Sequence, residues 1–566
     1  MWLPPLVCTA GAAPVWLPVG DSVDVIAALR TQGAAVDRHQ LTAAEQELLA
    51  PFVSNTDRDV FVLRNLPEVT KGAVFARYSR SPKPLRRLLV DEFGEDLAEG
   101  AGPAAGTGGE RAERMYQRVF VEYGDDSVAQ LGGAHVALEQ ISNVATKIVE
   151  RGRLAAYLEQ STRYMAYDDK LGGRYRYHRP AELADHPLAA SYAATLDGVF
   201  DAYAAALPVA RTWLARQHPR DDDTSERAWQ ASINAKACDL LRGLLPAATT
   251  SNVGMYASGQ AYEQLLLRLE AHDLAEARDL GAHLLRELRT VIPAFLARVD
   301  RPDRGGRWAR YLADTRAETR RVADELLVDM TPDATQPEVA LVDFDSEAED
   351  DVLVGMLYPH AHVSEHALRR RVALMTAGER VALVRAYVGG RTNRRHRPGR
   401  ALERARYRFD ICGDYGAFRD LQRHRMCTIE WQELSCRHGY DTPAELDACG
   451  LRDTWADTLE QQAQLWQALT EELPRVAPYA VGFAWRVRYS IQLNARAAMH
   501  LLELRTAPQG HASYRRVAQQ MHRLIAEHAG HRAIAEMMRF VDHADPQLGR
   551  LDAERRTDAR RALSRS

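Results

Sequence analysis

Two arginine-rich segments of this chain carry residue types that bind anionic oxygens. The first starts at Arg151-Gly152-Arg153 and reaches a Glu-x-Ser-x-Arg element at 159–163. The second starts at Arg423-His424-Arg425 and reaches the same element at 433–437. Guanidinium groups bind phosphate oxygens in pairs and keep their charge at every working pH, and a serine hydroxyl can complete a phosphate cradle. The two segments therefore predict a site for phosphorylated ligands such as nucleotides.

The interval between the two segments indicates how the chain is built. They start 272 residues apart (423 minus 151), which is about half of the 566 residues. A repeat at this interval predicts a core made of two related units. A single Arg-x-Arg pair is usually part of ordinary surface salt bridges, and that interpretation stays open beside the shared site that two ordered copies favour.

Composition and charge limit the class of protein. Hydrophobic residues make up 46% and charged residues 27%, as in soluble globular proteins. A net charge of −4 gives no general attraction to nucleic acid or membranes. The six cysteines are scattered, which favours a reduced cytoplasm over a disulfide framework. We expect no membrane span, because no apolar run reaches about 18 residues, and no export, because the first residues lack a basic leader.

The order of apolar and polar segments predicts an α+β fold, with two tandem helix-rich units that each contain a small antiparallel sheet. The expected divisions are an N-terminal extension (1–55), a first unit (56–330), a linker (331–340), a second unit (341–545) and a basic C-terminal tail (546–566). Among the local elements, we expect strands at 60–63 and 339–342 and helices at 141–149 and about 485–505.

Both segments resemble the flavin-dependent thymidylate synthases, whose fingerprint is R-H-R-x-x-S-x-N-E-x-S-x-R-Y. The first copy keeps the spacing but has Gly152, Ala156 and Leu158 in place of the histidine, serine and asparagine. The second keeps Arg423-His424-Arg425 but needs a two-residue insertion to align Gln432–Ser435, and His438 replaces the tyrosine.

The resemblance continues outside the fingerprint, over roughly 70–300 and 340–530. The family's N-A-R…L-R helix matches Asn494-Ala495-Arg496 and Leu504-Arg505. A nucleotide-binding arginine of the family matches Arg242, where the second half has Pro478.

The resemblance implies a reaction, its cofactors and its residues. Such enzymes convert dUMP to dTMP with FAD, NADPH and methylenetetrahydrofolate, without a cysteine nucleophile. Arg505 would be catalytic, because a fixed positive charge at the uracil edge favours the anionic base. The residues implied for dUMP are Arg151, Glu159, Gln160, Ser161, Thr162, Arg163, Arg242 and Arg505. Those implied for FAD are Ser79, Arg423, His424, Arg425, Asn494 and Arg496. Further candidates are Arg153, Tyr164, Glu433, Ser435, Arg437 and His500.

The losses in the two copies are complementary, and they lead to a hypothesis of one composite site. The first half keeps an ungapped Glu-x-Ser-x-Arg loop and Arg242, and would hold the phosphate and sugar. The second half keeps Arg423-His424-Arg425 and Arg505, and would hold the flavin and activate the base. Arg163 and Arg505 would then face the same nucleotide. Because family members are homotetramers, a chain with two units is expected to form a homodimer.

Other interpretations stay open. The chain could be a non-catalytic or altered-substrate homologue that binds flavin or a pyrimidine nucleotide. The arginine-rich stretch 391–408 could bind nucleic acid, but the acidic total charge favours a solvated helix near an anionic-ligand site. No metal is expected, because Cys427, Cys436, His424 and His438 fit no C-x-x-C spacing.

Overall fold

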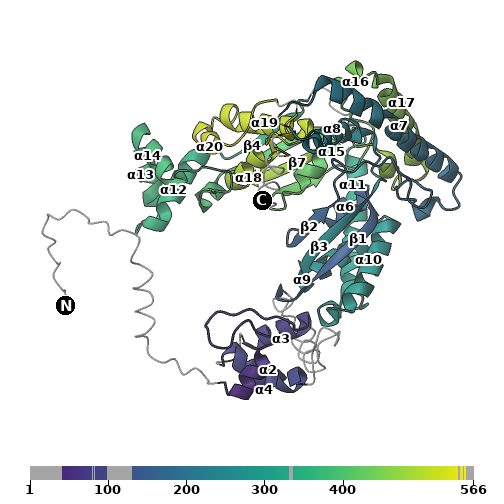
Figure 1. Cartoon of the computed structure of the whole chain (residues 1–566). Coiled ribbons are helices and arrows are strands. Elements are labelled where there is room, and N and C mark those ends of the chain that lie inside the picture. The colour runs from purple at the N-terminus through teal and green to yellow at the C-terminus, as the bar shows by residue number, and fades with distance from the viewer. Residues whose placement is uncertain are drawn as a thin grey trace. The chain divides into compact units, whose positions relative to one another are not determined.

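The computed structural model describes residues 41–78, 81, 83–98, 130–222, 224–330, 336–545, 548–551 and 554–555. The chain divides into two compact units, Met1–Glu110 and Arg111–Ser566, and we describe each unit by itself (Figure 1). Most of the expected N-terminal extension and C-terminal tail, and residues 331–335 of the expected linker, lie outside the described residues. The expected domain boundaries stay predictions.

The N-terminal unit contains three helices in its described part, α2 (Ala43–Leu49), α3 (Glu68–Tyr78) and α4 (Leu85–Ala98). Helix α2 begins with a capping box between Thr42 and Glu45, and the Glu45 carboxylate also binds Arg87 of α4 at 2.7 Å. The strand expected at 60–63 is wrong. Val60 and Val62 are 83% and 65% exposed, and only Leu63 makes a bridge, with Val53, so no neighbouring strand buries the apolar run.

The C-terminal unit contains two antiparallel sheets. One has the order β1-β3-β2 and the other β4-β5-β7-β6. The strands are β1 (Gly133–Ser142), β2 (Ala155–Glu159), β3 (Thr250–Ser258), β4 (Val339–Phe344), β5 (Arg406–Asp414), β6 (Thr428–Trp431) and β7 (Arg486–Asn494). This helix-rich chain with two small antiparallel sheets confirms the expected α+β two-unit arrangement.

Helices surround both sheets. In the first half they are α6 (Asn143–Val149), α7 (Leu188–Gln217), α8 (Glu226–Leu241), α9 (Gly259–Glu270), α10 (Ala275–Arg289) and α11 (Gly305–Leu326). In the second half they are α12 (Ala348–Leu357), α13 (Glu365–Ala373), α14 (Ala377–Val388), α15 (Tyr415–Gln422), α16 (Glu445–Ala448), α17 (Arg452–Glu472), α18 (Ala495–Arg505), α19 (Ala512–Glu527) and α20 (Arg532–Met537). No helix in these described stretches is long and apolar enough to span a membrane.

The two halves repeat the same local design, in which a strand runs directly into a capped helix. Ser142 ends β1 and caps α6, and Asp414 ends β5 and caps α15, 272 residues later (414 minus 142). Ser258 ends β3 and caps α9, and Asn494 ends β7 and caps α18, 236 residues later (494 minus 258). Each cap oxygen accepts a backbone N–H of the first helical turn. These offsets match residues of one half with residues of the other.

Three further expectations have clear outcomes. The strand expected at 339–342 is confirmed as β4, and the helix expected at 141–149 is confirmed from Asn143, because 141–142 end β1. The helix expected over 485–505 is wrong in its first half. Residues 486–494 form β7, in which Val487, Tyr489, Ile491 and Leu493 are buried at every second position.

Backbone hydrogen bonds join the two halves where the chain leaves α8 and α17. Ala247 N donates to Val481 O at 2.7 Å, and Phe483 N donates to Leu245 O at 2.9 Å. Adding 236 to 245 and 247 gives 481 and 483, so the two bonds exchange equivalent positions as in a two-fold symmetric contact. Helices α7 and α17 pack against each other beside this junction (Figure 1).

We expect Gly243→Ala to destabilise the junction by about 1–3 kcal/mol. A Cβ at Gly243 would lie 2.4 Å from Trp455 Cη2 and 3.0 Å from Ala484 Cβ, so the two halves would have to move apart. Thermal unfolding of the full chain measures the change. The matched control is Gly198→Ala in α7, where only Gln461 Oε1 lies near, at 3.9 Å, and helix propensity predicts a gain of roughly 0.5–1 kcal/mol. Equal effects of both variants would contradict the tight packing at Gly243.

Candidate functional site

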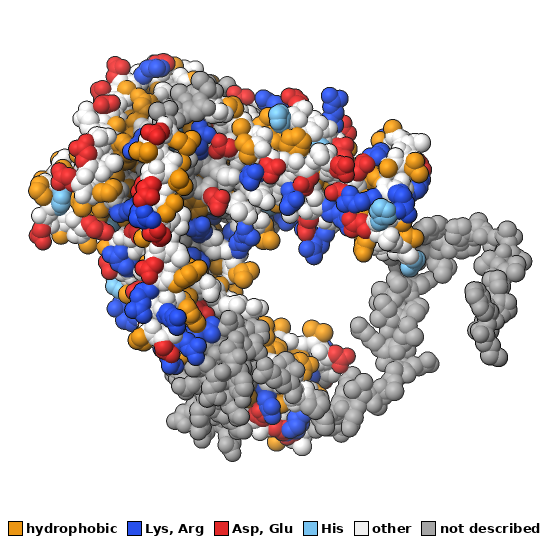
Figure 2. All heavy atoms as spheres, turned by 180° about the vertical axis from the view of Figure 1, so that it is seen from behind, with side chains coloured by type: hydrophobic (Ala, Val, Ile, Leu, Met, Phe, Trp, Pro, Cys, Tyr) orange, Lys and Arg blue, Asp and Glu red, His pale blue; other side chains and the backbone are white. Residues whose placement is uncertain are grey.

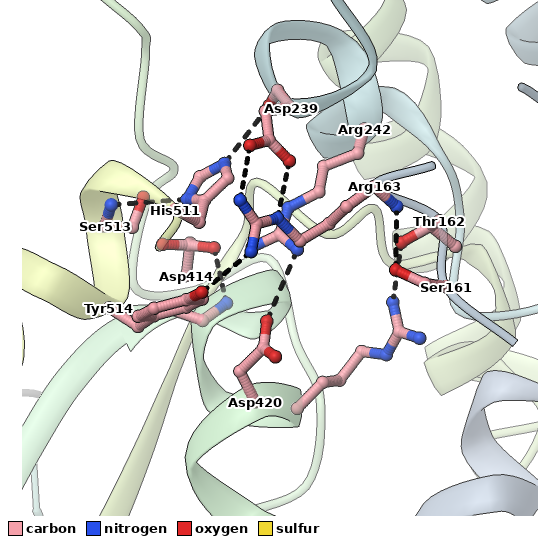
Figure 3. Close-up of polar contacts among 12 residues, drawn as sticks. Ser161, Thr162, Arg163, Asp239, Arg242, Asp414, Asp420, His511, Ser513 and Tyr514 are labelled. Atoms are coloured by element: carbon pink, nitrogen blue, oxygen red, sulfur yellow. Dashed lines mark hydrogen bonds and ion pairs between the residues drawn. The ribbon is translucent and has the colours of Figure 1, made fainter. Parts of the chain in front are cut away.

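A cluster of charged side chains from both halves lies at the junction. We call Arg163, Asp239, Arg242, Asp420, Arg505 and Tyr514 the arginine cluster. Arg163 follows the loop after β2, Asp239 is on α8, and Arg242 begins the short 3₁₀ turn after α8. Asp420 is on α15, Arg505 ends α18 and Tyr514 is on α19. Figure 3 shows the first-half arginines pointing toward the second-half acid and tyrosine.

Arg163 is held by both halves. Its Nε and Nη2 each lie 2.7 Å from one oxygen of Asp239, which is a bidentate pair. Its Nη1 donates to the Tyr514 hydroxyl at 2.7 Å, and Nη2 also donates to Gln509 O at 3.0 Å. These contacts fix the guanidinium against the second half (Figure 3).

Asp420 is the shared acceptor for the other two arginines. Arg505 Nη1 lies 3.2 Å from Asp420 Oδ1, and Arg242 Nη1 lies 3.5 Å from Oδ2. Burial disfavours the charge on Asp420, but the positive charges of Arg505, Arg242 and Arg163 hold its pKa well below the usual range. The cluster thus contains three guanidinium groups and two carboxylates, and the buried carboxyl group of Asp414 lies beside it (Figure 3).

The Tyr514 ring lies near both of the arginines that we expected at one nucleotide. The guanidinium carbon of Arg163 lies 5.6 Å from the ring centroid, and that of Arg505 lies 5.4 Å from it. The same ring therefore lies near both arginines, although they are 342 residues apart in sequence (505 minus 163).

His424 orients Arg505. Arg505 Nε donates to His424 Nε2 at 3.0 Å, so this nitrogen carries no proton. Burial, together with the charge of Arg505, lowers the pKa of His424 well below its usual value. The His500 ring lies 5.4 Å from the His424 ring and 3.3 Å from Arg397 Nη2, measured at Nδ1. Two neutral imidazoles thus lie among several arginines.

The first Glu-x-Ser-x-Arg loop contacts the cluster through Arg419 of α15. Glu159 accepts from Arg419 at 2.7 Å and from Lys147 at 3.1 Å, and Thr162 Oγ1 lies 3.5 Å from Arg419. Burial disfavours the charge on Glu159, but Lys147 and Arg419 lower its pKa to about 2. This carboxylate is therefore fully engaged within the protein.

The remaining residues of the first copy lie around this loop. Ser161 Oγ accepts the Arg163 amide at 3.3 Å, Gln160 contacts Met165 Sδ at 2.8 Å, and the Tyr164 ring lies between Arg163 and Arg550. Arg151 lies 5.4 Å from the Trp431 ring centroid, and Arg153 donates to Thr428 Oγ1 at 2.9 Å. The Arg-x-Arg pair of the first half thus reaches β6 of the second.

The second Glu-x-Ser-x-Arg loop does not reach the cluster. Glu433 lies 3.7 Å from Arg475, Ser435 Oγ lies 3.5 Å from the Arg437 amide, and Arg437 lies over the Trp466 ring. Arg425 faces the Tyr157 ring of β2 at 5.7 Å, and Arg423 is exposed.

The other residues expected at a flavin are already bonded within the fold. Asn494 Oδ1 caps α18, and Arg496 binds Pro398 O at 3.1 Å and Glu403 at 3.3 Å. Ser79 lies outside the described residues. None of the expected site roles is tested by these contacts, and all of them stay predictions.

The equivalent positions of the other half lack these groups. The 272-residue offset matches His424 with Gly152 and Asp420 with Ile148, and the 236-residue offset matches Arg505 with Leu269. A Cβ at Gly152 would lie 2.9 Å from the Tyr157 hydroxyl and 3.5 Å from Arg268 Nη2, so neighbouring side chains fill this space. Among the residues that the structure describes, one of the two related positions carries an arginine cluster and the other does not.

The basic stretch 391–408 is not the expected solvated helix. It contains a loop, a short 3₁₀ turn at Arg400–Arg404 and the start of β5. Arg391 is 2% exposed and pairs with Glu503 at 2.6 and 2.8 Å. Basic and acidic side chains are interspersed over the face seen in Figure 2. In the described parts of the chain, no group of three or more His, Cys, Asp or Glu residues could hold a metal ion.

Comparison with known proteins identifies the family. The profile of the family described as thymidylate synthase complementing protein matches residues 73–294 and 352–529, which is 400 of the 566 residues. The chain belongs to this family. This confirms the resemblance that the two arginine segments indicate.

Several relatives match nearly the whole chain. The UPF0159 protein of Chlamydia pneumoniae is 37% identical over 92% of this chain and 98% of its own length. That of Chlamydia muridarum is 35% identical over 91% and 98%, and that of Thermoplasma acidophilum is 30% identical over 87% and 99%. A solved structure of the UMP/dUMP methylase PolB from Streptomyces cacaoi, bound with 5-Br dUMP, is 21% identical. It covers 36% of this chain and 97% of its own, with a TM-score of 0.29.

Sequence reasoning missed Asp239, Asp420 and Tyr514. A signal existed for the two acids, because each lies three residues before an arginine of interest, Arg242 or Arg423, and so one helical turn away. Tyr514 had no such signal, since it lies on a helix outside the matched motifs.

The buried Asp414 makes the stability of the fold depend on pH. It is 6% exposed, and burial, together with the nearby charge of Asp441, raises its pKa to about 6 despite the opposing charge of Arg242. The unfolded chain ionises an aspartate near pH 4, so between about pH 4 and 6 only the folded protein keeps this proton. The stability that the protonated group contributes is therefore lost as the pH rises through that window, and the loss is constant above it.

We expect the free energy of unfolding of Asp414→Asn, relative to that of the wild type, to rise by roughly 2–3 kcal/mol as the pH goes from 4 to 7. Asparagine keeps the cap, because its Oδ1 can still accept the Ala417 amide, which Asp414 Oδ1 binds at 2.8 Å. Urea unfolding at several pH values measures this difference. The exposed Gln217→Asn, which changes no titratable group, is the control, and its difference should stay flat over the same range. A flat difference for Asp414→Asn would contradict a raised pKa.

Proposed function

We propose that this chain is a flavin-dependent thymidylate synthase, which converts dUMP to dTMP with methylenetetrahydrofolate and NADPH. Family membership supports the reaction class. The observation that carries the proposal is the meeting of Arg163 and Arg242 from the first half with Arg505 and His424 from the second. The proposal places one composite site at this junction, because the equivalent positions Gly152 and Leu269 lack the side chains.

The arginines suit a nucleotide that has a negative phosphate at one end and a base that becomes negative at the other. In our proposal, Arg163 and Arg242 bind the phosphate and Arg505 lies at the uracil edge. A fixed guanidinium favours the anionic form of a ring N–H and stabilises negative charge that develops on the base. His424 accepts from Arg505 Nε at 3.0 Å and Asp420 accepts from Nη1 at 3.2 Å, so both orient the guanidinium, and in our proposal Nη2 donates to the base.

Asp239 and Asp420 orient the arginines, but they also occupy donors that a phosphate would need. Asp239 and Asp420 hold the three arginines in place, which lowers the cost of ordering long side chains around a ligand. A phosphate that binds here must share or displace these carboxylates.

The residues near His424 fit an anionic flavin nucleotide. Arg423 and Arg397 are exposed and have no carboxylate partner among the described residues, and both lie near the imidazoles of His424 and His500. Unpaired guanidinium groups and imidazole N–H groups are donors for diphosphate oxygens. FAD would supply the hydride chemistry when bound. Asn494 and Arg496 would shape its pocket through the backbone that they hold.

A second candidate function is flavin or pyrimidine-nucleotide binding without turnover, or with another pyrimidine substrate. The observation that favours it is the complete pairing of Arg163 with Asp239, which a substrate phosphate must disturb. We also propose a homodimer and a cytoplasmic location. The five described cysteines are free, which suits a reducing compartment.

For turnover, we expect Arg163→Ala and Arg505→Ala each to lower dTMP formation about 10²–10³-fold, the usual cost of losing one donor to developing charge or to a bound anion. The measurement is dTMP produced from dUMP, methylenetetrahydrofolate and NADPH. The control is Arg452→Ala, an exposed arginine paired with Asp447. Because Arg163→Ala leaves Asp239 without its partner, the double variant Arg163→Met/Asp239→Asn removes both charges together. Full activity in the Arg163 and Arg505 variants would contradict the composite site.

For the cofactor, we expect the purified chain to carry a flavin absorbance band and His424→Ala to lose most of it. Alanine removes a group that contacts Arg505 and lies near Arg423, so both arginines would lose their orientation. The exposed His366→Ala on α13 is the matched control and should keep the band. Wild-type protein that binds no added FAD in a fluorescence titration would contradict flavin use.

A further inference from the structure

The loop of residues 389–399, which we call the 389–399 loop, connects α14 with the 3₁₀ turn at Arg400–Arg404. It opens the basic stretch 391–408, which contains eight arginines. Five of these arginines pair with a carboxylate, and the partners are Glu503, Glu403, Glu365, Asp345 and Asp343. The other three, Arg394, Arg395 and Arg397, have no carboxylate partner among the described residues. The unpaired positive charge of this stretch is therefore gathered in the loop.

The 389–399 loop is fastened to the fold, although it has no regular secondary structure. Arg391 anchors its start, because this side chain is 2% exposed and pairs with Glu503 of α18 at 2.6 Å. Inside the loop, the Arg395 amide donates to Asn393 Oδ1 at 2.8 Å, and Asn393 Nδ2 lies 3.1 Å from His396 Nε2. A loop that is ordered before a ligand arrives loses less entropy on binding. The unpaired arginines thus stand on a prepared support.

The loop lies beside the two imidazoles of the proposed flavin site. Arg397 Nη2 lies 3.3 Å from His500 Nδ1, and the His500 ring lies 5.4 Å from the His424 ring. Burial, together with the charges of Arg397 and Arg394, lowers the pKa of His500, so Arg394 lies near the same imidazole. Arg395 is exposed and follows Arg394 directly. The loop is therefore a positively charged rim next to the position that we propose for the flavin.

The proposed reaction brings a second anion to this rim. A nicotinamide donor must lie against the flavin that it reduces, with the reacting atoms about 3–3.5 Å apart. The adenosine end of NADPH then extends away from the flavin, and its 2′-phosphate, like other phosphate monoesters, carries about −1.5 to −2 charges at pH 7. An arginine commonly accommodates this 2′-phosphate in NADP-binding proteins, because guanidinium groups bind phosphate oxygens in pairs. NADH has a neutral hydroxyl at the same position and gains nothing from such a contact.

We propose that the 389–399 loop binds the 2′-phosphate of NADPH through Arg394 and Arg395, and that it thereby makes the chain select NADPH over NADH. The inference rests on the proposed flavin site beside His424. Arg397, which contacts His500, stays on the flavin side of the loop. The binding involves no covalent step.

The first test is isothermal titration of the full chain with 2′,5′-ADP, which carries the 2′-phosphate without the nicotinamide, and with 5′-AMP, which lacks the 2′-phosphate. We expect 2′,5′-ADP to bind about tenfold or more tightly, because its extra phosphate gains charge-assisted hydrogen bonds. In the double variant Arg394→Gln/Arg395→Gln, this advantage should fall to about threefold or less. The matched control is Arg400→Gln, which should keep the wild-type advantage, because Arg400 is exposed in the same stretch and already pairs with Glu403 at 3.0 Å.

The second test is the preference between the two reductants in dTMP formation. The ratio of kcat/KM with NADPH to kcat/KM with NADH should fall roughly tenfold in Arg394→Gln/Arg395→Gln, because the two reductants differ only in the group that these arginines contact. Arg400→Gln should leave the ratio at its wild-type value.

The outcomes separate this inference from the proposed function. If the chain forms dTMP but the double variant keeps its preference for NADPH and for 2′,5′-ADP, the inference is wrong and the proposed function stands. If the wild type binds neither added FAD nor 2′,5′-ADP, both are wrong. A double variant that loses as much affinity for FAD as for 2′,5′-ADP overturns the inference, because the loop would then hold the flavin diphosphate. So does a wild type that binds a single-stranded oligonucleotide through these arginines and shows no preference for 2′,5′-ADP.

Discussion

The backbone junction between the two halves is the constraint on which the rest of the site depends. Residues 243–248 and 479–484 exchange hydrogen bonds at equivalent positions, and Gly243 lies against Trp455 with no room for a side chain. Arg242 directly precedes this junction, so its guanidinium has a fixed starting point beside α15 of the other half. The two-fold character of the contact brings the ends of both sheets together, where their capped helices begin.

Buried charge then completes the assembly. Arg163, Arg242 and Arg505 come from three distant parts of the chain, and each binds a carboxylate that is largely shielded from water. A buried carboxylate without a partner is strongly destabilising, so each arginine is required by the acid that it contacts. The same pairs that stabilise the junction hold the three guanidinium groups in place, and Arg242 Nη2 is buried without a hydrogen bond among the described residues.

The two related halves carry different side chains at equivalent positions. His424 keeps its place beside Arg505, whereas Gly152 leaves a space that the Tyr157 hydroxyl and Arg268 occupy. One of the two equivalent positions therefore carries the arginine cluster, and at the other the space beside Gly152 is filled by neighbouring side chains.

The sequence by itself determined the doubled arginine segments, the family, the α+β class and the candidate residues, because these depend on residue type and spacing along the chain. It also contained the alternation of apolar and polar residues from Val487 to Leu493, which indicates a strand. Our expectation of a helix over 485–505 did not take this alternation into account. Only the tertiary structure decided that Arg163 and Arg505 share Tyr514, and that Asp239 and Asp420 pair with the arginines. Spacing within one segment does not encode which distant segments meet. Packing at the junction determines that, and burial then decides which charges must pair.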